Sequence, residues 1–217
     1  MPRNMTTDRS DLLLHPQLRA YVEARVPELA AITAARRQSL DTLAQFIATE
    51  QAAGEPVRLI FICTHNSRRS HISQLWAAAA AAWYGLEVAT YSGGTEATAF
   101  NPRAVAAMRR AGFEIDDPGG DNPRYTVSFS PGGPKISAFS KIWTHAANPQ
   151  TGFAAIMTCD SADAACPLVL GSRARISLPY RDPKADDGSP REASSYDASV
   201  RLIATEMLYV FERAVRQ

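Results

Sequence analysis

The sequence predicts an α/β fold in which a four-stranded parallel sheet lies between helical layers. Two observations support this prediction. Apolar runs of strand length alternate with segments whose apolar residues recur at helical spacing, an order that is typical of parallel sheets. The chain has 217 residues, 46% of them hydrophobic, which suffices for one domain with a sizeable core.

The elements are assigned from their apolar patterns and from their end signals. Gly and Pro mark most of the ends, because they end or begin regular elements. The predicted strands are 57–62, 87–92, 154–158 and 174–178. The predicted helices are 16–53, the segment from 72 to 83, the segment from 101 to 112, and 192–216.

We expect two parts in the chain. Residues 1–55 form an N-terminal helical arm, which either packs on the core or joins two subunits of a homodimer. Residues 56–217 form the α/β domain. Within it, residues 117–150 interrupt the alternation, and two strand-like runs around Pro131-Gly132-Gly133 predict a β-hairpin insertion.

Composition excludes several classes of protein. The formal net charge is +1, so no general electrostatic attraction to nucleic acid or to an anionic membrane is expected. No apolar stretch has the length of a membrane span, and Leu12-Leu13-Leu14 is too short for a signal peptide. The three cysteines are too few for a secreted disulfide framework, which favours a cytoplasmic protein. We expect no cofactor and no metal.

The segment Cys63–Ser70 carries the clearest chemical signal. Cys63 and Arg69 are six positions apart, between a predicted strand and a predicted helix. A loop in that position presents backbone N–H groups to an anion, and Arg69 can hold two of its oxygens. The same groups favour the thiolate of Cys63, which makes it a nucleophile. A cysteine that is merely buried at a strand end is the alternative.

The residues expected to line this anion loop bind through their backbone N–H groups or their hydroxyls. They are Thr64, His65, Asn66, Ser67, Arg68 and Ser70.

Two further segments could contribute to chemistry. Cys159 follows a predicted strand and Cys166 lies seven positions later, so the two thiols could resolve a bond formed at Cys63 by disulfide exchange. Two buried structural cysteines are the alternative, and a zinc site would lack nearby histidines. Asp182, after the last strand, could protonate a leaving oxygen or could belong to a solvated turn.

These motifs together resemble a known family. Cys63–Ser70 resembles the anion loop of the low-molecular-weight protein tyrosine phosphatases, and it is most similar to that of the thioredoxin-coupled arsenate reductases, which share their fold. The resemblance continues through Tyr91–Glu96 and Asn101–Val105. Cys159–Pro167 is similar to the redox segment of the reductases. Asp182 falls where the family has its general acid.

The resemblance implies a role for each residue. Cys63 would attack arsenate while Arg69 and the loop amides hold its oxygens, and Asp182 would protonate the departing hydroxide. Cys159 would then attack Cys63 and release arsenite. Cys166 would move the disulfide to Cys159–Cys166, and thioredoxin would reduce it.

The sequence also departs from the family. His65 replaces a common Gly, Arg68 replaces a fourth cysteine, and Gln74 replaces the Glu that often binds potassium in the reductases. Lys184 stands where the phosphatases have Tyr, which disfavours an aryl-phosphate pocket.

Two other functions remain open. A phosphatase that acts through a cysteinyl-phosphate would need only Cys63, Arg69 and Asp182. A non-catalytic anion sensor would keep the loop without turnover, and the arm and the hairpin could then serve as partner surfaces.

Overall fold

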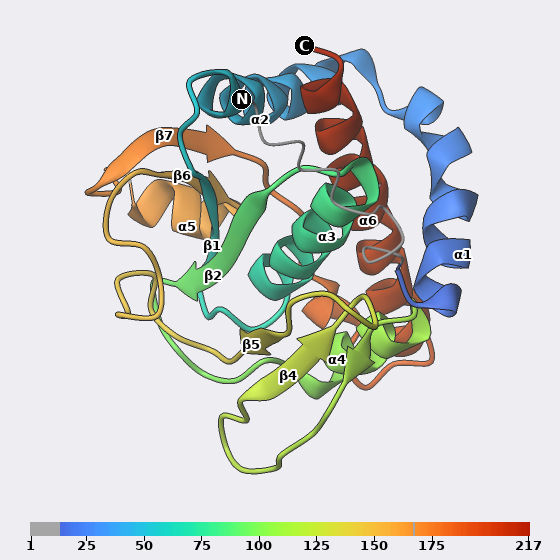
Figure 1. Cartoon of the computed structure of the whole chain (residues 1–217). Helices are drawn as coiled ribbons and strands as arrows, with labels where there is room; N and C mark the ends of the chain where they lie inside the picture. The colour runs from blue at the N-terminus through green and yellow to red at the C-terminus, as the bar shows by residue number, and fades with distance from the viewer. Residues whose placement is uncertain (1–13, 167) are drawn as a thin grey trace.

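The computed structural model describes residues 14–166 and 168–217 (Figure 1). The first 13 residues of the predicted arm, which include Leu12 and Leu13, lie outside the described residues. Pro167, at the end of the predicted redox segment, lies outside them as well.

The predicted parallel sheet is present. Its four strands lie in the order β2-β1-β6-β7, and every neighbouring pair is parallel. Each strand lies within a few residues of its predicted range. The strands are β1 (Val57–Cys63), β2 (Val88–Gly94), β6 (Phe153–Met157) and β7 (Ser172–Ser177).

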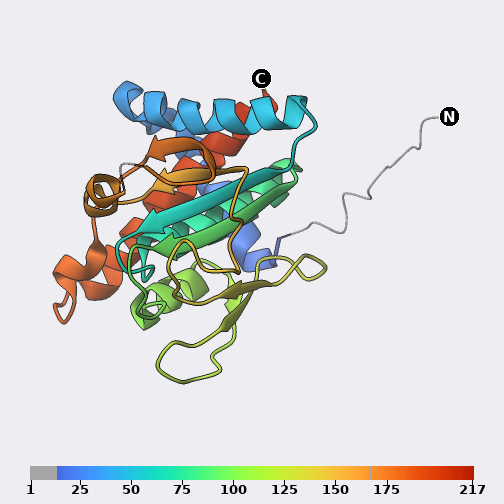
Figure 2. The ribbon, with the colours of Figure 1, turned by 90° about the vertical axis from the view of Figure 1, so that its left-hand side faces the viewer.

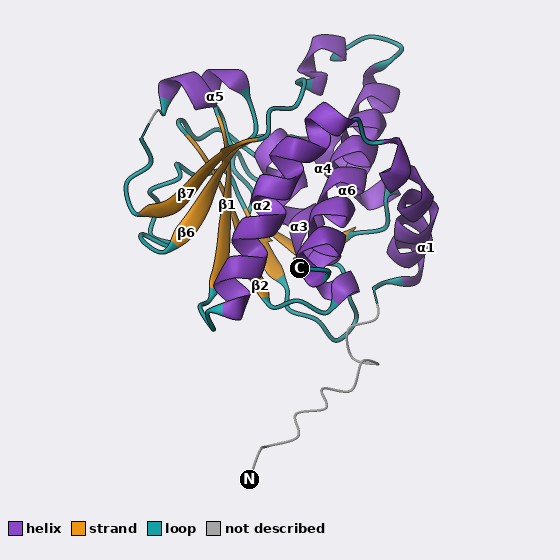
Figure 3. Ribbon diagram, turned by 90° about the horizontal axis from the view of Figure 1, so that it is seen from above, coloured by secondary structure: helices purple, strands orange, loops and turns teal. Residues whose placement is uncertain are grey.

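Both faces of this sheet are covered by helices, but more helices lie on one face than on the other. Leu59 and Phe61 of β1 point into the main core with the large helices, whereas Ile60 and Ile62 point to the opposite face and pack with Ala162 of α5. Seen from above, α5 lies on one side of the sheet and α2, α3 and α6 lie on the other (Figure 3). The α-helices are α1 (Pro16–Arg25), α2 (Ala34–Ala52), α3 (Arg69–Tyr84), α4 (Pro102–Arg110), α5 (Asp160–Ala165) and α6 (Glu192–Val215).

The segment predicted as helical over 16–53 is broken in the middle. A 3₁₀ helix, η2 (Val26–Ala31), follows α1, and Ile32 is extended with φ −62° and ψ 126°. Pro27 lies in the first turn of η2, where its missing N–H costs nothing; within a continuous α-helix it would remove a hydrogen bond. Thr33 then caps α2 by accepting a hydrogen bond from the N–H of Arg36.

Helix α2 packs on α6. Its apolar residues Leu40, Leu43 and Ile47 are fully buried in the main core. Arg36 makes a two-pronged ion pair with Glu206 of α6, with both N–O distances 2.7 Å. The described part of the arm therefore places its apolar face against the core of its own chain. The homodimer stays a prediction.

A second, small sheet lies beside the main one (Figure 2). Its strands are β3 (Glu114–Ile115), β4 (Tyr125–Ser128) and β5 (Ile136–Ala138), all antiparallel. The β4–β5 pairing is the predicted hairpin pairing. Tyr125 and Val127 of β4 are buried in the main core, so this ribbon is anchored on one face.

A short helix follows β7, at the end of the sheet where Cys63 lies. It is the 3₁₀ helix η3 (Pro183–Asp186), and Asp182 caps it by accepting from the N–H of Lys184.

Over the described residues, no helix is both long enough and apolar enough to cross a lipid bilayer.

Because α2 belongs to the core, we predict that Leu43→Ala lowers the free energy of unfolding by about 2–5 kcal/mol, the usual cost of removing a fully buried leucine side chain. Urea denaturation followed by circular dichroism measures this. Gln38→Ala, on the exposed face of the same helix, is the control and should change stability little. An equally small effect of both substitutions would contradict the packing of α2.

Candidate active site

The parallel sheet brings three predicted site residues to one edge. Cys63 is the last residue of β1, Cys159 follows the end of β6, and Asp182 follows the end of β7. The three strands are neighbours, so their carboxyl ends meet at the same edge. Ligands of open α/β sheets bind at such edges.

The loop between β1 and α3 is fixed by the side chain of Asn66. Asn66 has φ +45°, the only positive φ of a non-glycine residue among those described. Its Nδ2 donates to Ser70 Oγ at 2.9 Å, and its Oδ1 accepts from the backbone N–H of Lys141 at 2.9 Å. One buried amide therefore joins the loop to α3 and to the segment after β5.

The backbone N–H groups of this loop have no acceptor within the part of the chain that the structure describes. Among the hydrogen bonds of the described residues, none is donated by the N–H groups of residues 64–68. The loop carbonyls are bonded instead: Cys63 O accepts from Thr95 N, and Thr64 O accepts from Glu96 N. A row of free amides at a helix start is an anion-binding arrangement.

Gly94 permits the loop to lie against β2. A Cβ added to Gly94 would lie 2.7 Å from the carbonyl oxygen of Thr64 and 2.8 Å from the nitrogen of Asn66, both of them backbone atoms. Any side chain at this position would therefore displace the loop.

Cys63 is 3% exposed and lies beside Ser70, with 3.1 Å between Sγ and Oγ. Ser70 Oγ already accepts from Asn66, so its own hydrogen is free to point toward the sulfur. Asn66 donates to Ser70, and Ser70 can donate to Cys63. A Cys63 thiolate thus has one hydrogen-bond donor, which favours the nucleophilic form of the cysteine.

The Arg69 guanidinium is held by the segment after β7. Nη1 donates to Tyr180 O at 3.1 Å, and Nη2 donates to Asp182 Oδ2 at 2.9 Å. Its Nε is buried and has no partner within the described residues. Arg69 therefore lies beside Asp182, with one guanidinium donor unused among the described residues.

Arg68 takes a structural position that the sequence pattern did not indicate. Its Nε donates to Tyr196 OH at 2.9 Å and lies 3.9 Å from Asp182 Oδ1. Tyr196 OH in turn donates to Asp187 Oδ1 at 2.8 Å. Burial, with the Asp187 contact, raises the pKa of Tyr196 to about 12. The Arg68 side chain therefore braces the Asp182 segment against α6.

The other predicted loop residues are placed as follows. Ser67 is buried, and its carbonyl accepts from Asn101 N. The His65 side chain is about half exposed and lies 3.5 Å from Glu96, while its carbonyl accepts from Ser140 Oγ. Thr64 Oγ1 lies 3.5 Å from Cys159 Sγ.

Cys159 and Cys166 lie at opposite ends of α5. Cys159 is 1% exposed and caps the helix, with its sulfur accepting from Ala162 N. Cys166 is partly exposed, and burial raises the pKa of its thiol, while Arg175 acts in the opposite direction. Cys63, Cys159 and Cys166 are all free thiols that belong to, or pack against, one apolar cluster.

His71 is part of the core, although it follows the loop closely. It is fully buried, stacks on Phe100 at 4.2 Å, and its Nδ1 lies 3.2 Å from Ser92 Oγ. Burial holds its pKa well below the usual value, so the ring is neutral at pH 7. Its position does not support contact with substrate.

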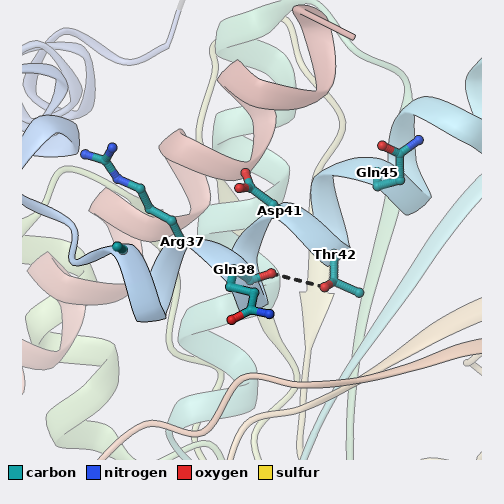
Figure 4. Close-up of a pocket in the computed structure, with 6 residues that line it drawn as sticks. Arg37, Gln38, Asp41, Thr42 and Gln45 are labelled. Atoms are coloured by element: carbon teal, nitrogen blue, oxygen red, sulfur yellow. Dashed lines mark hydrogen bonds between the residues drawn. The ribbon is translucent and has the colours of Figure 1, made fainter.

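A separate hollow of about 590 Å³ lies on the outer face of α2, away from the cysteines (Figure 4). Its charged side chains serve to hold α2 in place. Arg37 donates to the carbonyls of Leu29 and Ala30, and Asp41 accepts from Tyr209 OH. None of the predicted site residues lines this hollow.

The part of the chain that holds the anion loop is similar to known proteins. Residues 58–119 match the family model of low molecular weight phosphotyrosine protein phosphatase. This segment is similar to that family. It runs from β1 to just beyond β3 and holds the whole anion loop.

Curated proteins that this chain is similar to carry the name arsenate reductase. The one from Bacillus licheniformis is 44% identical over 59 residues, which are 27% of this chain and 40% of that protein. The one from Halalkalibacterium halodurans is 25% identical over 134 residues, 62% of this chain and 79% of that protein. The chain spans about two fifths of the length of the first curated relatives that it matches.

The chain also has a distant likeness to solved structures. The low molecular weight protein tyrosine phosphatase from T. tengcongensis is 15% identical, with 72% of this chain and 98% of that chain covered and a TM-score of 0.49.

The Ser70 contact leads to a prediction. Ser70→Ala removes the donor to the Cys63 thiolate and should slow alkylation of Cys63 by iodoacetamide at pH 7 by roughly ten-fold, the scale of one hydrogen bond to a charged group. Peptide mass spectrometry measures the rate at Cys63 alone. Ser73→Ala is the control, since Ser73 is buried one turn later and its hydroxyl has no hydrogen-bond partner among the described residues. Equal rates in wild type and Ser70→Ala would contradict the assignment.

Proposed function

We propose that this protein reduces arsenate to arsenite through a relay of its three cysteines, with thioredoxin as the reductant. The observation that carries the proposal is the position of Cys159, whose sulfur lies 3.5 Å from the hydroxyl of Thr64 in the anion loop. A second buried thiol at the loop favours disulfide chemistry over hydrolysis alone. The arsenate reductase names of the relatives point in the same direction.

The first step forms a bond between Cys63 and arsenic. The free loop amides and the unused Nε of Arg69 hold the oxygens of arsenate, and the thiolate attacks. One oxygen leaves as water after it gains a proton, for which Asp182 is the candidate donor. Asp182 is one-third exposed and lies against Arg69, so it is close to the entering anion.

The second step transfers two electrons to arsenic. Cys159 attacks the sulfur of Cys63, a Cys63–Cys159 bond forms, and the sulfur–arsenic bond breaks with its electron pair on arsenic, which leaves as arsenite. Cys166 then attacks Cys159 and frees Cys63 as a thiolate. A dithiol reductant, here thioredoxin, supplies two electrons to the Cys159–Cys166 disulfide.

This last disulfide requires α5 to unwind. Six helical residues lie between the two cysteines, so seven steps of the helical rise, 1.5 Å each, place their Cα atoms about 10 Å apart. A disulfide needs its Cα atoms within about 7 Å. Helix α5 has only six residues, so its unfolding costs little beyond the contacts that hold it to β7.

A phosphatase is the second candidate. The observation in its favour is the direct 2.9 Å contact between Arg69 and Asp182, since Cys63, Arg69 and Asp182 suffice for hydrolysis through a cysteinyl-phosphate. Because arsenate and phosphate have the same shape and charge, weak hydrolysis of phosphate esters is expected under either proposal.

Cysteine variants separate these functions. We expect Cys159→Ser and Cys166→Ser each to stop arsenite formation with thioredoxin, thioredoxin reductase and NADPH, while hydrolysis of p-nitrophenyl phosphate survives. Cys63→Ser is the control and should stop both reactions. A wild type that hydrolyses the phosphate ester but ignores arsenate would refute the reductase in favour of the phosphatase. Turnover of neither substrate would favour an anion sensor.

The unwinding of α5 gives a separate prediction. Arg175 of β7 holds the helix: it donates to Asp163 O at 2.6 Å and to Cys166 O at 2.9 Å, and it pairs with the Asp163 carboxylate. Arg175→Met should speed formation of the Cys159–Cys166 disulfide by diamide roughly five-fold, the equivalent of about 1 kcal/mol for a partly exposed pair.

The control for this measurement is Arg173→Met. Arg173 lies on the same strand but pairs with Glu50 of α2, so its loss should leave α5 and the rate of disulfide formation unchanged. If Arg175→Met oxidises at the wild-type rate, the helix is not held by this arginine.

A further inference from the structure

A second cavity lies away from the anion loop. It has a volume of about 980 Å³ and lies between α3, the outer edge of β2 and the β4–β5 ribbon. In Figure 1 the ribbon runs below α3 and β2. Neither Cys63 nor Arg69 lines this cavity. Much of its wall is apolar, including Ala78, Ala82, Val88, Ile136 and Phe139.

Two cations face this cavity without an acidic partner. Lys141 is 5% exposed, and its Nζ lies 4.7 Å from the centre of the Phe139 ring. The Arg124 guanidinium lies over the same ring at 3.7 Å. Within the described residues, neither side chain forms an ion pair. The acidic residue of the lining, Glu87, is exposed at the rim.

A buried ammonium group without a counter-ion is costly. Consistent with this, burial lowers the pKa of Lys141 to about 8, and the nearby Arg124 acts in the same direction. An anion in the cavity would remove this cost, because it would pair with Lys141 and Arg124 together. The electrostatics of the cavity therefore fit a ligand with an acidic group.

Two buried oxygens on the cavity wall give a second, independent observation. Gln74 and Asn148 line the cavity, are 3% exposed, and donate through their side-chain nitrogens to the carbonyls of Thr90 and Ser92 on β2. These bonds fix the amide orientation. The remaining oxygens, Gln74 Oε1 and Asn148 Oδ1, have no partner in the described structure and need a donor.

We propose that this cavity binds an organic acid with an apolar body that also carries a hydroxyl or amide N–H. The acidic group pairs with Lys141 and Arg124, the apolar body lies against the wall formed by α3 and the ribbon, and the donor bonds Gln74 or Asn148. The site is separate from the proposed reductase chemistry, and nothing in that chemistry requires it.

Three probes of equal length test the ligand class on the full chain. Isothermal titration calorimetry at pH 7 compares 10-hydroxydecanoate, decanoate, which lacks the hydroxyl, and 1,10-decanediol, which lacks the acid. We expect 10-hydroxydecanoate to bind tightest, decanoate several-fold weaker, and the diol at least ten-fold weaker. A diol that binds as tightly as the hydroxy acid would overturn the proposal, as would the absence of binding by all three.

Variants locate the site. Lys141→Met should weaken 10-hydroxydecanoate at least ten-fold and leave the diol unchanged, whereas Lys135→Met, on the same ribbon but outside the cavity lining, should alter neither. Ala82→Phe should fill the cavity and weaken every probe. If Lys141→Met fails to fold, Arg124→Met at an exposed position makes the same test. Unchanged binding in the folded cation variant or in Ala82→Phe would show that the acid binds elsewhere.

Discussion

The geometry of the candidate active site depends on the two hydrogen bonds of the Asn66 side chain. The chain must turn sharply between β1 and α3, and at Asn66 it does so with a positive φ, which asparagine tolerates better than most residues. The amide nitrogen holds Ser70 on α3, and the amide oxygen holds Lys141 after β5. A loop whose N–H groups have no acceptor among the described residues needs such support from other segments, because it lacks the hydrogen bonds that normally fix the backbone.

The charges around the loop are largely paired before any ligand arrives. Arg69 pairs with Asp182 at 2.9 Å, and Arg68 lies between Asp182 and Asp187. The two arginines therefore face two carboxylates, and their fields partly cancel at the loop. Much of the attraction for an oxyanion must then come from the free backbone amides and from the start of α3, which are fixed dipoles and need no reorganisation.

The anion loop and its position at the carboxyl ends of the strands could be predicted from the sequence, because the residues that define them are close together in the chain. A strand that ends in Cys63, five residues of loop and a helix from Arg69 predict an anion site, and parallel strands bring their carboxyl ends together. The partners of the two arginines could not be predicted in the same way. Asp182 is 113 residues from Arg69, and Tyr196 is 128 residues from Arg68, so those contacts follow from packing alone.

Lys141 contributes to both the anion loop and the second cavity. Its backbone N–H donates to Asn66, and its carbonyl accepts from Gly94 N, so its main chain supports the anion loop and the end of β2. Its side chain instead lies against Phe139 in the second cavity. Because the loop contacts are made by backbone atoms, a change of the side chain leaves them in place. Lys141 therefore belongs to both the anion loop and the cavity, but a substitution of its side chain changes the cavity without changing the loop contacts.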